Sequence, residues 1–195
     1  MKKGKFLKLS QMNTVKLFTA ALFATVLFTS CSSDDDTPEI VNEEEVITTL
    51  TVTLTPSGTG DVITLQTQDL DGDGPDDPVI TVSGNLISGE VYQGSIVLLN
   101  ETVDPAEDIT EEVEDESDEH QFFYTVASTL DVSTEYTSFD DDGNPLGTTF
   151  TLTAGAASTG NLTFTLIHEP TKPNDGLTDA GGETDAEATF SVTVE

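Results

Sequence analysis

The chain has 195 residues with 37 acids and six lysines, and five of those lysines lie in the first 30 residues, which contain no acid. The part after residue 30 has 37 acids against one lysine, so its formal net charge is −36. This charge excludes nucleic acid and anionic lipid as direct partners, because their phosphates would be repelled. It favours cations as ligands; the alternative is that it only keeps an exported protein soluble.

Residues 1–30 have the organisation of a signal peptide. A lysine-rich start is followed by an apolar run over residues 17–28 and then by the small residues Thr29 and Ser30. The run is shorter than the roughly 20 residues that a membrane-spanning helix requires. We therefore predict export followed by cleavage before Cys31.

Cys31 is the predicted site of a lipid anchor. Residues 27–31 (LFTSC) resemble the bacterial lipobox, which implies a diacylglycerol on Cys31. The alternative, an unmodified thiol on an exported protein with no second cysteine, is disfavoured because such a thiol is reactive. Residues 32–36 (SSDDD) resemble the export signal of surface lipoproteins of the Bacteroidota, which implies attachment to the outer membrane, facing the cell surface. Residues 31–45 are polar and acidic and are expected to form a lipidated flexible tether.

Residues 46–195 are expected to form one β-rich domain. Leu50, Val52 and Leu54 alternate with threonines, as on a strand with one buried face. Turn-forming residues separate further runs of this kind, which favours an all-β fold, an antiparallel immunoglobulin-like β-sandwich. The predicted strands are 50–54, 62–67, 79–83, 90–100, 121–127, 130–139, 148–153, 161–168 and 188–194. The predicted core consists of Val52, Leu54, Leu98, Phe122, Tyr124, Tyr136, Phe150, Phe164, Phe190 and Val192.

The one segment without strand character is residues 105–119, for which we predict a short acidic helix. Asp104 is a suitable N-cap, Pro105 suits the first helical position, and Ile109 and Val113 are four residues apart. Nine of the thirteen residues 107–119 are acids, and repulsion among them makes disorder the competing interpretation.

The sequence DLDGDG at residues 69–74 resembles the calcium loops of EF-hand, dockerin and thrombospondin repeats. Oxygen ligands at alternate positions and a glycine at the turn are what Ca²⁺ requires of a short loop. The candidate ligands are Asp69, Asp71, Asp73 and Asp77. Ile80 stands where an EF-hand has a bidentate glutamate, so an EF-hand is excluded. The alternatives are a loop-only calcium site, completed from elsewhere in the chain, and a plain turn between strands.

The two histidines are candidate ligands of a transition metal. Glu116 and His120 are four residues apart and would share a helix face, whereas His168 ends a predicted strand on its apolar face. Two imidazoles and a carboxylate suit Zn²⁺ or iron. His168 on that face is equally compatible with a buried, hydrogen-bonded histidine.

Enzymatic activity is not expected. Apart from the predicted lipidation site there is no cysteine nucleophile, there is no arginine to hold an oxyanion, and no glycine-rich phosphate loop follows a strand. Carboxylates are too numerous for any pair of them to indicate glycosidase chemistry.

Residues 43–50, 118–124 and 168–176 resemble those of small acidic flavobacterial outer-membrane lipoproteins. The resemblance implies a role beside an outer-membrane transporter. Members are sometimes labelled as having a type 1 periplasmic binding fold, but two α/β lobes would need about twice this length and regularly alternating helices. Two functions stay open: a cation-binding surface lipoprotein, or an adhesion module with only structural calcium.

Overall fold

The computed structural model describes residues 45–72 and 74–195. The predicted signal peptide, the predicted lipidation site Cys31, residues 32–44 of the predicted tether and the calcium candidate Asp73 lie outside the described residues. Over the described ranges, no helix is long and apolar enough to cross a membrane.

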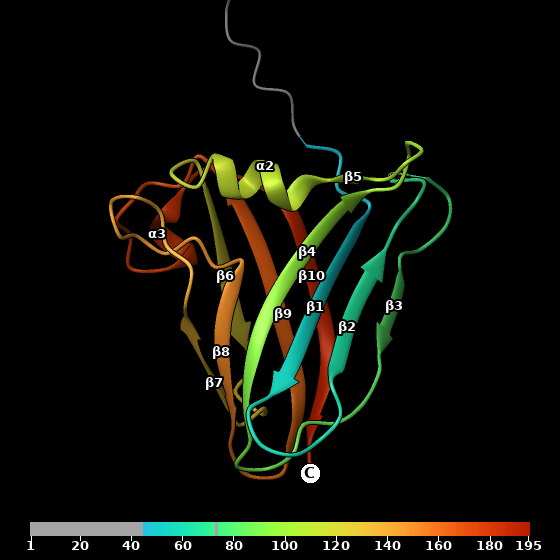
Figure 1. The fold of residues 1–195 in the computed structure, drawn as a ribbon, viewed down its shortest axis with the longest axis vertical. Coiled ribbons are helices and arrows are strands. Elements are labelled where there is room, and N and C mark those ends of the chain that lie inside the picture. The colour runs from blue at the N-terminus through green and yellow to red at the C-terminus, as the bar shows by residue number, and fades with distance from the viewer. Residues whose placement is uncertain (1–44, 73) are drawn as a thin grey trace, which may run out of the picture. The chain divides into compact units, whose positions relative to one another are not determined.

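Two antiparallel sheets pack face to face (Figure 1). The larger sheet has the strand order β3-β2-β1-β4-β8-β7, with β5 also paired to β4, and the smaller sheet has the order β10-β9-β6. The strands are β1 (Thr49–Pro56), β2 (Ile63–Gln68), β3 (Val79–Val82), β4 (Val91–Asn100), β5 (Glu107–Asp108), β6 (His120–Val126), β7 (Val132–Tyr136), β8 (Thr149–Ala154), β9 (Ser158–His168) and β10 (Glu183–Val194). The predicted all-β antiparallel sandwich is thus confirmed.

The core lies between the sheets and follows from the alternation of side chains along each strand. In β4, every second residue from Tyr92 to Leu98 is buried, and its neighbours face outward. Of the predicted core, the aliphatic and phenylalanine side chains are all buried. Tyr124 and Tyr136 are half-buried, and their hydroxyls donate hydrogen bonds to backbone carbonyls at 2.5 Å and 2.9 Å. Each predicted strand overlaps an observed one.

The helix α2 (Ile109–Asp115) is shorter than the predicted span 105–119 and begins later. The residues before it, Glu107 and Asp108, pair with β4 as β5, so Asp104 does not cap the helix. Asp108 is the N-cap instead, and its carboxylate accepts a hydrogen bond from the Thr110 N–H at 3.0 Å. A second short helix, α3 (Leu177–Ala180), follows Gly176 and was not predicted.

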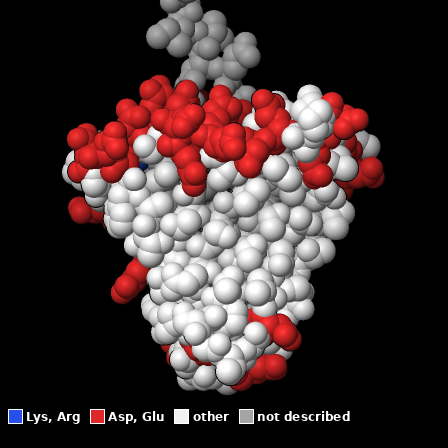
Figure 2. Space-filling model, in the orientation of Figure 1, with Lys and Arg blue, Asp and Glu red and all other residues white. Residues whose placement is uncertain are grey.

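The helix α2 buries one face and exposes a strongly acidic one. Ile109 and Val113 join the core, whereas the acids of residues 107–119 are all exposed. Figure 1 shows α2 lying across one end of the two sheets, and Figure 2 shows Asp and Glu side chains gathered at that end. The visible flank of the sandwich is largely uncharged. On the face shown in Figure 2, the acidic side chains are therefore concentrated at the end where α2 lies.

Candidate metal-binding site

The two histidines lie side by side at the end of the smaller sheet. His120 begins β6, His168 ends β9, and the two residues are direct partners in the antiparallel register. Their rings stack with centroids 4.6 Å apart and planes 19° from parallel. Both are buried, with 0% and 5% exposure. The structure thus brings together the two histidines that the sequence singled out.

Two carboxylates that the sequence did not single out complete the group. Glu45 precedes β1, and Asp185 lies at a bulge in β10 where the register with β9 shifts. Their side chains are 5% and 3% exposed. The bulge inserts one additional residue into β10, which turns the Asp185 side chain toward the histidines. We call Glu45, His120, His168 and Asp185 the inner group.

The distances within the inner group suit a metal ion. One ligand atom from each residue lies within 4.8 Å of all the others. His120 Nε2 is 3.0 Å from Glu45 Oε1 and 3.8 Å from Asp185 Oδ2, and His168 Nδ1 is 3.8 Å from Asp185 Oδ1. Ligand atoms around tetrahedral zinc, with bonds of about 2.0–2.1 Å, are about 3.3 Å apart. The observed distances bracket this value, so small side-chain shifts would close the site on an ion.

The tautomer of His120 is fixed by the turn after α2. His120 Nδ1 is 3.2 Å from the Glu116 carbonyl oxygen, which can only accept, so Nδ1 carries the proton. Nε2 therefore faces Glu45 and Asp185. His120 Nε2 lies 3.0 Å from Glu45 Oε1, which is hydrogen-bond distance, and a cation bound by both atoms would replace that contact. A metal-bound histidine typically donates its other ring nitrogen in this way.

One oxygen of Glu45 has no hydrogen-bond partner in the part of the chain that the structure describes. Oε1 contacts His120, whereas Oε2 is buried without a hydrogen-bond partner among the described residues. Burying an unpaired carboxylate oxygen is costly, by about 1–3 kcal/mol or more. A bound cation would remove this cost.

Lys172 supports the backbone next to the site. Its ammonium donates to the carbonyls of Ser117 and His120 at 2.6 Å and 2.7 Å, and to Asp140 Oδ2 at 3.3 Å. Burial would raise the pKa of the Asp140 carboxyl, but hydrogen bonds from Asn144 and the Lys172 charge hold it below its usual value. Burial lowers the pKa of Lys172, against the opposing effect of Asp140. Lys172 thus fixes the chain where β6 begins.

Glu116 was predicted to be a metal ligand together with His120 and His168, but it contacts His120 in another way. Its backbone carbonyl, not its carboxylate, contacts His120. The Glu116 carboxylate belongs to a second group with Glu112 and Glu45, whose ligand atoms also lie within 4.8 Å of one another. Glu116 is therefore beside the histidines but is not in the inner group.

The predicted calcium loop lies between β2 and β3, in the turn before Val79. Asp69 Oδ1 accepts hydrogen bonds from the Asp71 and Gly72 N–H groups at 3.3 Å and 2.9 Å. Asp71 Oδ2 accepts one from the Asp76 N–H at 3.3 Å. Asp77 is exposed, and in the described part of this loop no three acids converge on one point. These hydrogen bonds stabilise the turn, as in an Asx-turn. Because Asp73 lies outside the described residues, the calcium site at Asp69, Asp71, Asp73 and Asp77 stays a prediction.

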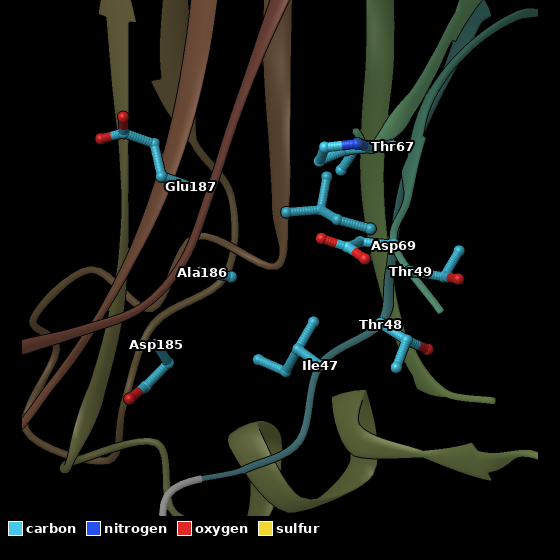
Figure 3. A pocket seen from close by; sticks show the side chains of 10 residues that line it. Ile47, Thr48, Thr49, Thr67, Asp69, Asp185, Ala186 and Glu187 are labelled. Carbon is cyan, nitrogen blue, oxygen red and sulfur yellow. The ribbon is translucent and has the colours of Figure 1, made fainter. Parts of the chain in front are cut away.

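A small hollow adjoins the inner group between β1 and β10. Its volume is about 200 Å³. Figure 3 shows Asp185, Ala186 and Glu187 on one side, Thr67 and Asp69 on the other, and Ile47 between them. The Asp185 carboxylate points away from Ile47. Sites for organic ligands are usually larger, about 300–1,000 Å³. This hollow suits water or an ion better than an organic ligand.

Sequence reasoning missed Glu45 and Asp185 for different reasons. Glu45 stands at the end of an acidic, polar segment that was assigned to the tether, and it is 75 residues from His120. Asp185 lies in residues 183–187 (ETDAE), which lack the apolar alternation that marks the rest of β10. The only signal for Asp185 was its position opposite the end of β9, which requires the strand pairing to be known.

Comparisons with protein-family models, with curated proteins and with solved structures give no match for this chain. The candidate site is therefore argued from its own geometry.

Proposed function

We propose that this chain is an exported, lipid-anchored lipoprotein of the cell envelope whose sandwich reversibly binds a divalent transition-metal ion in the inner group. Zn²⁺ is the first candidate and iron the second, because two imidazoles and two carboxylates suit both. In this role the protein captures the ion at the cell surface and delivers it to an outer-membrane transporter.

The observation that carries the proposal is the convergence of buried ligands from four separate segments. Glu45, His120, His168 and Asp185 lie far apart in the sequence, and one ligand atom of each lies within 4.8 Å of the others. The Glu45 and Asp185 side chains are 5% and 3% exposed, and a carboxylate is costly to bury unless a cation or hydrogen bonds compensate its charge. A divalent ion would neutralise the two carboxylates and use the Nε2 atom of His120.

Two further features favour reversible capture over a purely structural ion. The main hydrophobic core, which includes Phe122, Phe164 and Phe190, does not involve the inner group, so the sandwich has a source of stability of its own. The inner group lies where β6 begins, just after α2. Acids gather at the α2 end of the domain (Figure 2), and such a surface raises the local concentration of cations.

The arrangement supports binding without catalysis. Four protein ligands fill a tetrahedral zinc ion, whereas catalytic zinc keeps one position for water or substrate. The adjoining hollow of about 200 Å³ is small for an organic substrate.

The binding proposal is tested by calorimetric titration of zinc into the purified, chelator-treated full chain. We expect one tight site in the wild type and at least tenfold weaker binding by Asp185→Asn, which keeps the shape of the side chain. Glu187→Gln is the matched control, since Glu187 lies two residues along β10 and outside the inner group. Equal binding by the wild type and Asp185→Asn would contradict the proposal.

The anchor is tested separately in cells. Cys31→Ala should abolish incorporation of labelled palmitate and release the exported protein from the membrane fraction. Unchanged labelling would contradict lipidation at Cys31 and would leave the metal-binding proposal unaffected.

A further inference from the structure

A second carboxylate group lies beside the inner group and shares one residue with it. Ligand atoms of Glu45, Glu112 and Glu116 lie within 4.8 Å of one another. The Glu116 N–H donates to the Glu112 carbonyl at 2.9 Å, a helical spacing that places the two residues on one face at the end of α2. Both are exposed, whereas the Glu45 side chain is 95% buried (5% exposed). We call Glu45, Glu112 and Glu116 the outer group.

Exposed acids alone do not indicate an ion, but Glu45 provides an independent observation. One of its oxygens contacts His120, and the other, Oε2, is buried with no hydrogen-bond partner in the described part of the chain. Glu45 belongs to both groups and has one carboxylate oxygen, Oε2, for which the described residues provide no hydrogen bond. Such a carboxylate is suited to bridge two cations, one on each oxygen.

We propose that Glu45 bridges two divalent cations, one in the inner group and a second one held by Glu112 and Glu116. This inference rests on the proposed function, because the inner ion is the one that function requires. It adds a second site with a different ligand chemistry and gives Glu45 a specific role as the bridging ligand.

The two groups together contain four carboxylates, those of Glu45, Asp185, Glu112 and Glu116, whose charge two divalent ions would neutralise. Paired metal ions in proteins commonly lie about 3.5–4 Å apart.

The ligands of the outer group define the class of its ion. Three carboxylates with no nitrogen or sulfur ligand suit hard cations such as Mn²⁺, Mg²⁺ or Ca²⁺. Because two of the three carboxylates are exposed, water would complete the coordination, and the ion would exchange more readily than the inner one.

The test is a titration of Mn²⁺ into the zinc-loaded full chain. Binding is monitored by the loss of the electron paramagnetic resonance signal of free Mn²⁺. We expect one Mn²⁺ per chain above the weak background of the surface acids. The double variant Glu112→Gln, Glu116→Gln should bind Mn²⁺ at least tenfold more weakly and should bind zinc as the wild type does. Glu111→Gln with Glu114→Gln removes two charges from another part of α2 and should change neither ion.

The outcomes are distinguishable. Equal Mn²⁺ binding by the two double variants overturns the second site, and loss of zinc from the Glu112→Gln, Glu116→Gln protein overturns the separation into two sites. Glu45→Gln should weaken both ions, and weakening of only one overturns the bridge. Failure of the wild type to bind zinc overturns the proposed function, whatever Mn²⁺ does.

Discussion

Replacement of His168 by glutamine should remove most of the stability that zinc gives the protein. His168 is 5% exposed and stacks on His120, so glutamine fills a similar place without offering an imidazole nitrogen. On the proposed function, zinc would bind the folded state in preference to the unfolded one and would raise the free energy of unfolding with the logarithm of its concentration.

The size of the effect follows from linkage. At free zinc 1,000-fold above the dissociation constant, the wild type gains about 4.1 kcal/mol. Mutation of an outer-shell partner alone costs about 10–100-fold in metal affinity. If loss of the His168 ligand weakens binding about 100-fold, zinc is left at only about ten times the new dissociation constant. The gain then falls to about 1.4 kcal/mol. For a domain of this size, about 1 kcal/mol moves Tm by about 2–4 °C. We therefore expect zinc to raise Tm by about 8–16 °C in the wild type and by about 3–6 °C in His168→Gln.

The assay is thermal unfolding by circular dichroism, with and without zinc, for each protein. The difference within each variant is compared, so any destabilisation of the metal-free fold cancels. Thr165→Val changes a buried β9 residue outside the inner group and should retain the full shift. A zinc-induced shift of the same size in the wild type and in His168→Gln would refute the assignment of His168 as a ligand.

Three further predictions concern the fold around the site. Lys172→Met should lower the free energy of unfolding by about 3–5 kcal/mol in urea titrations, because it leaves Asp140 and two backbone carbonyls, those of Ser117 and His120, without their buried ammonium partner. A loss below about 1 kcal/mol would contradict the assigned role of these hydrogen bonds. The pKa of Asp140 is lowered in the folded state, so its contribution to the free energy of unfolding is present above the unfolded pKa of about 3.9 and is lost as pH falls through the folded pKa. Asp140→Asn should therefore flatten the dependence of stability on pH below about pH 4. An unchanged pH dependence in this range would exclude the stabilising role of the Asp140 carboxylate. Phe164→Ala should cost about 3–5 kcal/mol by calorimetry, because Phe164 is fully buried among aromatic rings, and near-wild-type stability would show that the core is wrongly assigned.

Much of the fold could be predicted because strands with one buried face leave a period of two in the sequence. The alternation that begins at Leu50, for example, matches the burial pattern of β1. The alternation of apolar and polar residues did not reveal strands whose residues are mostly exposed. The first residues of β10 and the two residues of β5 are mostly exposed and carry no apolar alternation. The helix was placed too early because Asp104 and Pro105 form a plausible start, whereas pairing of Glu107 and Asp108 with β4 delays it.

The candidate site was predictable only in part, and for a physical reason. His120 and His168 are chemically distinctive and rare, so they stood out before their proximity was known. Glu45 and Asp185 are two of 37 acids, and nothing local distinguishes them. Selection of Asp185 depends on the antiparallel pairing of β9 with β6 and β10 and on the bulge at Asp185. Selection of Glu45 depends on a contact with His120 across 75 residues of sequence.

The most direct test of the account is anomalous diffraction at the zinc edge from crystals of the full chain grown with zinc. The account predicts a peak within bonding distance, about 2.0–2.2 Å, of His120 Nε2 and His168 Nδ1 and of oxygens of Glu45 and Asp185. A peak confined to the turn that contains Asp69 and Asp71, with none at the histidines, would contradict it.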